Sequence, residues 1–264
     1  MITAHRSPRL DGILQIGGSK NYTTRYILAT TLAHGVSVLH NPAPIDDARV
    51  MIECCRQLGA EIEEGEQQLA IRGTGGRMTT PHELSVGNAG AVARFLMAVS
   101  ATLPSPTRFT TPYPTSLGRR PHHDLLKALQ DLGCQSESRD GRLPLVVAGG
   151  LRRGGPVSIS GTTSSQFTTA LLFLAPLLEG LTEITVTGKQ RSAALLEQTL
   201  QVLHASGIEV EHRDLSQFRV QGPQPYQAGE YFIPGDWPAA AAIMAAAAVV
   251  ESDVTINGRY DDAQ

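Results

Sequence analysis

The chain has 264 residues, of which 41% are hydrophobic and 18% are charged, and its formal net charge is −3 at pH 7. This composition is typical of a globular protein with one large core or two smaller ones, and it excludes an intrinsically disordered chain. The slightly acidic balance gives no reason to expect nucleic acid as a partner, although a local basic cleft could bind small anions.

The sequence shows no sign of a membrane span or of a disulfide framework. The longest apolar run, residues 239–250, is rich in alanine and too short to cross a membrane, and residues 1–6 lack the apolar segment of a signal peptide. Cys54, Cys55 and Cys134 show no paired spacing, so we expect reduced thiols, no metal site and a cytoplasmic location.

An internal repeat organises the chain. Three stretches each contain a helical pattern, a glycine and two short strands, and the glycines Gly59, Gly133 and Gly207 follow one another at intervals of 74 residues. A strand, a helix and another strand precede each stretch, so the repeating unit is βαβαββ. The predicted first strands are residues 12–16, 84–86 and 157–160, and the predicted first helices are residues 22–33, 91–103 and 166–178.

A fourth unit begins near the end of the chain. Residues 231–234 are predicted to form a strand, residues 239–250 a helix that starts with Pro238, and residues 254–256 a further strand. By the pattern of the other units, a second helix should follow, and the sequence ends at Gln264. We therefore expect that the rest of this unit lies outside the 264 residues or is completed by a partner.

The first helix start of the repeat has the features of an anion site. Two glycines and Ser19 precede the helical pattern, Lys20 lies in its first turn, and Arg25 lies about a turn and a half later. Unpaired N–H groups and the helix dipole favour a phosphate or carboxylate at such a place. The alternative is that Ser19 is an ordinary N-cap with two cations nearby.

Similar starts recur in the other two units, at residues 87–94 and 160–166. The second contains Asn88, Gly90 and Arg94, and the third is rich in hydroxyl side chains and ends at Gln166. In a threefold arrangement these starts should converge on one end of the domain and create a pocket of N–H groups, hydroxyls and cations. Capping alone remains the alternative for each of them.

Four stretches, residues 17–25, 87–94, 116–121 and 160–166, resemble in order and spacing the motifs of the 5-enolpyruvylshikimate-3-phosphate (EPSP) synthase family. The resemblance covers the whole chain and implies the α/β enolpyruvyl transferase fold, with six βαβαββ units in two domains. Residues 15–227 would then form a three-unit domain, and residues 1–14 and 228–264 would form part of a second, C-terminally truncated domain.

The resemblance also implies an activity. The family transfers the carboxyvinyl group of phosphoenolpyruvate to the 5-hydroxyl of shikimate 3-phosphate and releases phosphate, with no metal or organic cofactor, and the full-length enzyme would be a monomer. The implied contacts with shikimate 3-phosphate are Lys20, Asn21, Arg25, Ser164, Ser165, Gln166 and Ser192. Phosphoenolpyruvate would contact Lys20, Gly90, Arg120 and Gln166, and Asn88 and Arg94 would support the site.

Three departures from the family pattern bear on the substrate. Asn21 stands in place of a usual Ser, Leu195 in place of a frequent Tyr, and Ala91 in place of a frequent Thr. The Lys20–Asn21 pair resembles instead the sibling UDP-N-acetylglucosamine enolpyruvyl transferase, whereas residues 110–120 contain no counterpart of the sibling's reactive cysteine. The shikimate enzyme is therefore preferred.

Two further alternatives belong to other classes of protein. The chain could be a non-catalytic half-enzyme that binds a ligand, or it could resemble RNA 3′-terminal phosphate cyclase, against which its near-neutral charge counts. In the EPSP synthase family the general acid and base come from the second domain. We therefore expect the isolated 264-residue chain to be inactive.

Other polar residues are given structural roles. Adjacent His122 and His123 do not share a helix face, so they are predicted to be exposed at a helix start and not to bind metal. Asp46 and Asp47 are predicted to cap a helix over residues 49–58.

Overall fold

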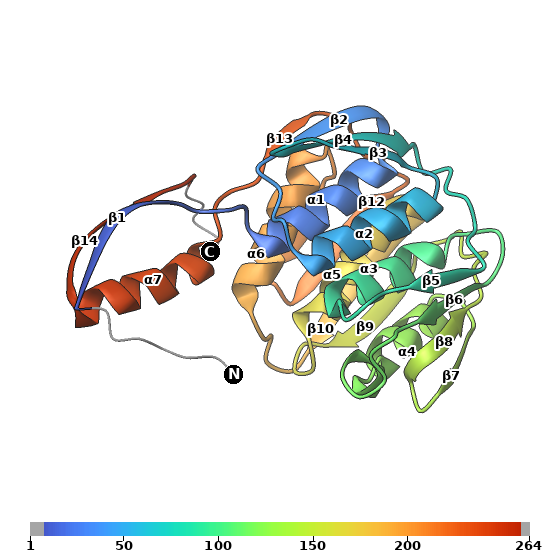
Figure 1. Cartoon of the computed structure of the whole chain (residues 1–264). Helices are drawn as coiled ribbons and strands as arrows, with labels where there is room; N and C mark the ends of the chain where they lie inside the picture. Colours follow the sequence, from blue (N-terminus) through green and yellow to red (C-terminus); the bar gives the residue numbers. More distant parts are fainter. Residues whose placement is uncertain (1–7, 260–264) are drawn as a thin grey trace.

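Three small sheets with the same strand order organise the computed structural model, which describes residues 8–259 (Figure 1). The expectations for residues 1–6 and for the ends of the predicted second domain lie outside the described residues. The mixed α/β class and the three repeated units predicted from the sequence are confirmed.

Each sheet consists of four strands, of which the first two are parallel and the others antiparallel. The first sheet contains β13 (Glu230–Phe232), β2 (His34–His40), β4 (Gln68–Thr74) and β3 (Glu61–Glu64). The second contains β5 (Glu83–Ser85), β6 (Thr107–Thr110), β8 (Arg142–Val147) and β7 (Ser136–Arg139). The third contains β9 (Pro156–Ser160), β10 (Gly180–Thr187), β12 (Gln217–Gly222) and β11 (Glu211–Arg213).

The first strand of the first unit was predicted wrongly. Residues 12–16 were expected to fill that place, but most of them belong to β1 (Arg9–Gln15), which pairs in parallel with β14 (Glu251–Asn257) in a separate sheet. The place is taken by β13, which lies about 190 residues further along the chain than its partner β2. The error follows from the prediction rule, because hydrophobic periodicity identifies a strand but not its partner.

The first helices of the three units lie inside the domain. They are α1 (Lys20–Leu32), α3 (Gly90–Ser100) and α5 (Ser165–Leu174), and α5 continues into the 3₁₀ turn η2 (Ala175–Leu177). Every residue of α3 is buried, and α3 packs against α5, while α1 packs against α2 and α6. All but the first two residues of α1 are likewise buried, so these helices are surrounded by protein on nearly all sides.

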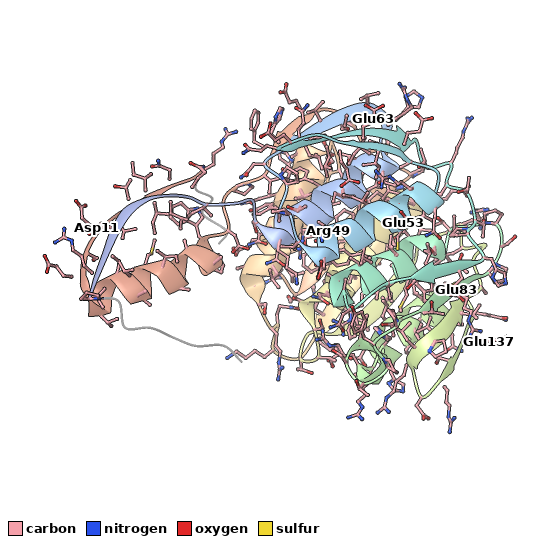
Figure 2. The ribbon with its side chains drawn as sticks, viewed as in Figure 1. Asp11, Arg49, Glu53, Glu63, Glu83 and Glu137 are labelled. Carbon is pink, nitrogen blue, oxygen red and sulfur yellow. The ribbon has the colours of Figure 1, made fainter. Side chains whose placement is uncertain are left out.

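The second helices of the units bury only one face. They are α2 (Asp46–Gln57), α4 (His123–Asp131) and α6 (Ala193–Ala205). In α2 the buried Ala48, Met51, Ile52 and Cys55 recur at helical spacing. The exposed face of α2 carries Arg49 and Glu53, which Figure 2 shows on the outer surface of the domain.

Each of these helices ends at one of the repeat glycines, as the 74-residue interval predicted. Gly59, Gly133 and Gly207 have φ values of +102°, +101° and +78°. The N–H of Gly59 donates to Arg56 O at 3.0 Å, and the next N–H donates to Cys55 O at 3.0 Å, which is the Schellman arrangement. The same pair of bonds follows α4 and α6.

The remaining elements form an arm beside the three-unit body (Figure 1). β1 and β14 lie along α7 (Trp237–Val249), in which only Ala240 is buried. The chain crosses between body and arm at two hydrogen-bonded segments, with Ser19 N donating to Pro234 O at 2.8 Å and Asp236 N donating to Gly17 O at 2.9 Å. The division into a domain of residues 15–227 and a second domain remains a prediction. Over residues 8–259, no helix is long and apolar enough to cross a membrane.

Candidate functional site

The structure brings the start of α3 and the start of α5 together through Arg94. Its Nη1 donates to Ser164 Oγ at 3.3 Å and to Gln166 Oε1, and its guanidinium lies over the ring of Phe167, 4.8 Å from the centroid. Ser164 is the N-cap of α5, and its Oγ also accepts the backbone N–H of Gln166 at 3.3 Å. The serine therefore acts both as a cap and as a bridge to α3.

Arg120 reaches the same place from the short 3₁₀ turn η1 (Leu117–Arg119). A Cβ added to Gly90 would lie 3.1 Å from Arg120 Nη1 and 3.7 Å from both Arg94 Nη1 and Gln166 Oε1. Three of the predicted site residues thus surround a fourth, Gly90, which is the first residue of α3. A glycine at this position leaves the N-terminus of α3 open between two guanidinium groups.

Gly90, Arg94, Arg120 and Gln166 form what we call the Arg94 cluster. The electrostatics of this cluster favour an anion. Burial, together with the positive charge of Arg120, lowers the pKa of Arg94 from 12.5 to about 10. Two neighbouring cations repel each other, so a phosphate or carboxylate between them would relieve that repulsion. The arrangement can therefore bind an oxyanion through charge-assisted hydrogen bonds.

His122 was predicted to be exposed, and the structure shows that it is buried with no accessible surface. It is the N-cap of α4, and its N–H donates to Gly141 O at 2.8 Å. Burial lowers its pKa to about 3, and the charges of Arg94, His123 and Arg120 contribute. The helix-face argument failed because an N-cap residue lies outside the helix, so helical periodicity says nothing about its direction.

Arg25 is 1% exposed and holds α1 to α6. Its Nε donates to Thr199 Oγ1 at 2.9 Å, and its Nη2 donates to Leu195 O at 3.0 Å. Its Nη1 donates to Asn21 O at 2.9 Å. Burial lowers the pKa of Arg25 to about 10. A ligand would therefore contact Arg25 only through the guanidinium N–H groups that are not used in these three hydrogen bonds.

Lys20 forms an ion pair that sequence reasoning missed. Its Nζ lies 2.9 Å from Asp47 Oδ2, with the lysine side chain 49% exposed and the aspartate 19% exposed. The predicted capping role of Asp46 and Asp47 is wrong, because both lie within the first turn of α2 and Ile45 is its N-cap. The sequence signal for this ion pair was the presence of two acidic residues in the first turn of α2, where negative charge also complements the helix dipole.

The other predicted site residues lie at helix starts without joining the Arg94 cluster in the contacts described. Ser165 is buried in the first turn of α5, and Asn21 is partly buried in α1. Asn88 is exposed, and Ala89 follows it as the N-cap of α3. Ser192 is exposed and is the N-cap of α6, with a left-handed φ of +55°. Their binding roles remain predictions.

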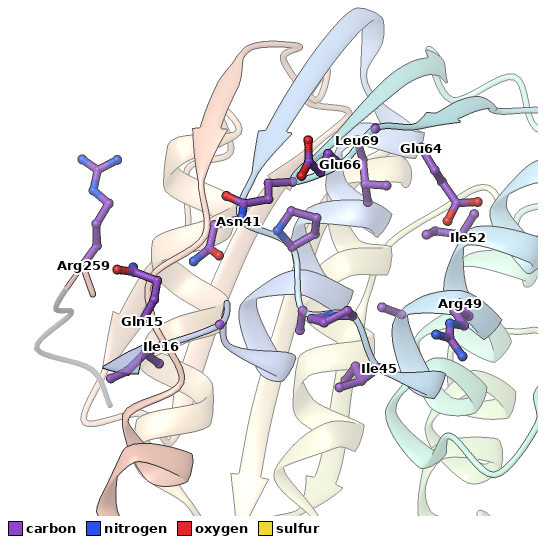
Figure 3. Close-up of a pocket in the computed structure, with 17 residues that line it drawn as sticks. Gln15, Ile16, Asn41, Ile45, Arg49, Ile52, Glu64, Glu66, Leu69 and Arg259 are labelled. Carbon is purple, nitrogen blue, oxygen red and sulfur yellow. The ribbon is translucent and has the colours of Figure 1, made fainter. Parts of the chain in front are cut away.

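A pocket of about 700 Å³ lies where the chain crosses between body and arm (Figure 3). Gln15, Ile16 and Arg259 line it from the crossing segments, and Arg49 and Ile52 line it from α2. None of the predicted site residues lines it. We place the candidate site at the Arg94 cluster because charged and polar groups converge there around a helix N-terminus.

Metal chemistry is a separate question from anion binding. Within residues 8–259, no group of three or more His, Cys, Asp or Glu side chains is placed to hold a metal ion.

The repeated βαβαββ units and the cation-lined helix starts define a class of α/β protein with a candidate oxyanion site. The family described as EPSP synthase (3-phosphoshikimate 1-carboxyvinyltransferase) matches residues 5–262. The chain therefore belongs to the EPSP synthase family, as the four motifs had indicated.

Named relatives agree with this membership. A 3-phosphoshikimate 1-carboxyvinyltransferase from Deinococcus radiodurans is 45% identical over 265 residues, which cover 100% of this chain and 60% of the relative. Another from Methanococcoides burtonii is 37% identical over 251 residues, covering 93% of this chain and 58% of the relative. The chain thus spans about 60% of the length of these relatives.

A solved structure shares the fold. An EPSP synthase from Acinetobacter baumannii superposes with a TM-score of 0.83 at 24% identity, and the match covers 95% of this chain and 56% of that structure. At this level of identity the likeness concerns the fold alone.

Proposed function

We propose that this chain contributes to the transfer of the carboxyvinyl group of phosphoenolpyruvate to the 5-hydroxyl of shikimate 3-phosphate, with release of phosphate. The observation that carries the proposal is the convergence of Gly90, Arg94, Arg120 and Gln166 at the starts of α3 and α5. The names of the relatives support the choice of substrates.

Phosphoenolpyruvate fits this cluster by its chemistry. It carries a phosphate and a carboxylate on the same carbon atom, and the two guanidinium groups can donate charge-assisted hydrogen bonds to these anions. Gln166 would hold the ligand from the side of α5. Cations fixed in advance also stabilise the negative charge that collects on the departing phosphate.

Shikimate 3-phosphate would be held by the serines of α5 and by Lys20. Ser164 and Ser165 lie at the N-terminus of α5, where N–H groups and the helix dipole favour a phosphate. Lys20 would leave Asp47, or share it, when it contacts the ligand. Asn21, Arg25 and Ser192 would supply further contacts, and Asn88 would support the start of α3.

The proposal also covers the cofactors, the location, the oligomeric state and the partners of the protein. No metal ion or organic cofactor takes part in the proposed transfer, the protein works in the cytoplasm, and the full-length enzyme is a monomer. Phosphoenolpyruvate and shikimate 3-phosphate are its ligands, and neither nucleic acid nor a membrane is a partner.

A thermal-shift experiment tests the choice of substrate. A ligand that binds only the folded state stabilises it, by about 2.7 kcal/mol at a concentration 100 times its Kd. The melting temperature rises as a result. We expect shikimate 3-phosphate to raise the melting temperature and UDP-N-acetylglucosamine to leave it unchanged. A rise with the nucleotide sugar alone would transfer the proposal to the sibling enzyme, and a rise with neither would overturn it.

A further inference from the structure

The three hydrogen bonds of the buried Arg25 side chain all go to uncharged oxygens. The acceptors are the hydroxyl of Thr199 and the backbone carbonyls of Leu195 and Asn21. One face of the guanidinium lies over the ring of Phe95, with Cζ 5.4 Å from the ring centroid. Buried charges in proteins are normally paired with an opposite charge, whereas these acceptors leave the positive charge of Arg25 available to an anion.

Thr199 lies on α6 at the centre of a small network of buried hydroxyl groups. Its Oγ1 is 2.7 Å from Leu195 O and 2.9 Å from Thr169 Oγ1 on α5, and both threonines are 0% exposed. A carbonyl oxygen carries no proton, so the hydroxyl of Thr199 donates to Leu195 O. The lone pairs of Thr199 Oγ1 then accept the Nε–H of Arg25 and the hydroxyl of Thr169.

Two nitrogens of Arg25 therefore bond to a connected pair of oxygens. The Nε donates to Thr199 Oγ1 and the Nη2 to Leu195 O, and the bond from Thr199 to Leu195 holds these two oxygens together. A guanidinium is planar, so fixing two of its nitrogens fixes the direction of the whole group. The three bonds of Arg25 leave one N–H on Nη1 and one on Nη2.

We propose that Thr199, supported by Thr169, is a positioning residue for Arg25, and that it directs the remaining Nη1 and Nη2 N–H groups towards an anionic group of shikimate 3-phosphate. A hydroxyl fixes the guanidinium without neutralising it. A carboxylate at the same place would compete with the ligand for the positive charge. The choice of ligand rests on the proposed function, whereas the positioning of the guanidinium does not.

Thr168 provides a matched control on the same helix as Thr169. It is also 0% exposed, and its hydroxyl has no hydrogen-bond partner within the described residues. Replacing a buried threonine by valine removes the hydroxyl and keeps a branched side chain. Thr168→Val therefore makes the same chemical change as Thr199→Val without touching the bonds of Arg25.

Rotation of the Arg25 guanidinium, measured by nuclear magnetic resonance in the ligand-free chain, tests the positioning role. The signal is assigned by its loss in Arg25→Lys. Because the group rotates only when its hydrogen bonds open, we expect Thr199→Val to accelerate rotation about tenfold or more. Thr199→Ser restores the acceptor and should restore the slow rotation of the wild type. Thr168→Val should change nothing.

Thr169→Val is a second variant that keeps the proposal testable if Thr199→Val fails to fold. It leaves the bond between Arg25 and Thr199 in place but removes a donor to Thr199, so we expect rotation to accelerate about threefold. Rotation at the wild-type rate in folded Thr199→Val would overturn the proposal. If only Thr169→Val folds, rotation at the wild-type rate in that variant would overturn it.

Titration with shikimate 3-phosphate separates this proposal from the proposed function. If the wild type binds, we expect Thr199→Val to weaken binding about tenfold and Thr199→Ser to restore it to within about twofold. Equal binding by the wild type and folded Thr199→Val would overturn the role of Thr199 in ligand binding and leave the proposed function intact. If the wild type does not bind, the proposed function fails and the rotation rates alone decide the positioning role.

Discussion

The Nη1 of Arg94 donates a hydrogen bond to the Oε1 of Gln166, which ties the first turns of α3 and α5 together. The two residues are 72 positions apart and lie on the first helices of successive repeats. The repeat thus places Arg94 of the second unit beside the polar start of α5 in the third unit. In our account, this contact organises the phosphoenolpyruvate end of the site.

Arg94→Lys should weaken phosphoenolpyruvate binding about tenfold or more, measured by isothermal titration. Lysine keeps the positive charge but cannot bond to Ser164 and Gln166 with a planar, forked group. Arg119→Lys is the matched control, since Arg119 is exposed and one residue from Arg120. Equal loss in both variants would indicate a general charge effect and contradict the assigned geometry.

Asp47→Asn should tighten binding of shikimate 3-phosphate by about 1.5-fold to 5-fold. The Lys20–Asp47 pair is partly exposed, and such pairs are worth about 0.2–1 kcal/mol, which is the cost of freeing Lys20. The unfolding free energy should fall by no more than about 1 kcal/mol. Titration and urea unfolding measure the two quantities, and Asp131→Asn, which removes the partner of exposed Lys127, is the control. Weaker binding in Asp47→Asn would show that Asp47 supports the site.

Gly73→Ala should destabilise the fold by about 3 kcal/mol or more. The added Cβ would lie 2.2 Å from Ala33 O and 2.3 Å from Thr30 O, and these backbone atoms close the end of α1. Gly155→Ala is the control, because its Cβ would meet only a Leu132 methyl group at 3.9 Å. Urea unfolding of both variants checks the prediction, and a change below about 1 kcal/mol at Gly73 would contradict the packing described.

The buried His122 should make the protein less stable in acid. Its pKa is about 3 when folded and 6.5 as a free group, so between these values the unfolded state binds a proton that the native state does not. Stability present above pH 6.5 is therefore lost as the pH falls towards 3, by at most about 1.4 kcal/mol per pH unit.

Urea unfolding at about pH 7 and about pH 5 measures this loss. We expect the wild type to lose up to about 2 kcal/mol more than His122→Asn over this range. His123→Asn should lose as much as the wild type. If wild type and His122→Asn lost the same amount, the ring of His122 would not be held neutral.

The sequence predicted the elements whose determinants are local. The helical spacing of Met51, Ile52 and Cys55 predicts an amphipathic helix, and Gly59 marks its end. Pairing between distant segments was not predictable in the same way. β13 pairs with β2 through backbone hydrogen bonds, which leave no periodic signal in the side chains.

Within the candidate site, residue types were predictable and partners were not. The cations and hydroxyls at the helix starts follow from the motifs, but the pairing of Lys20 with Asp47 depends on how α1 packs against α2. The burial of His122 likewise depends on the turn around Gly141, which closes over the N-cap of α4.

Isothermal titration of shikimate 3-phosphate into the chain tests the central claim most directly. We measure the wild type, Lys20→Ala and Ser165→Ala, with exposed Lys127→Ala as the control. The account predicts one saturable site that is weakened about tenfold or more by each of the first two substitutions and not by the third. No binding, or binding that Lys20→Ala and Ser165→Ala leave unchanged, would contradict it.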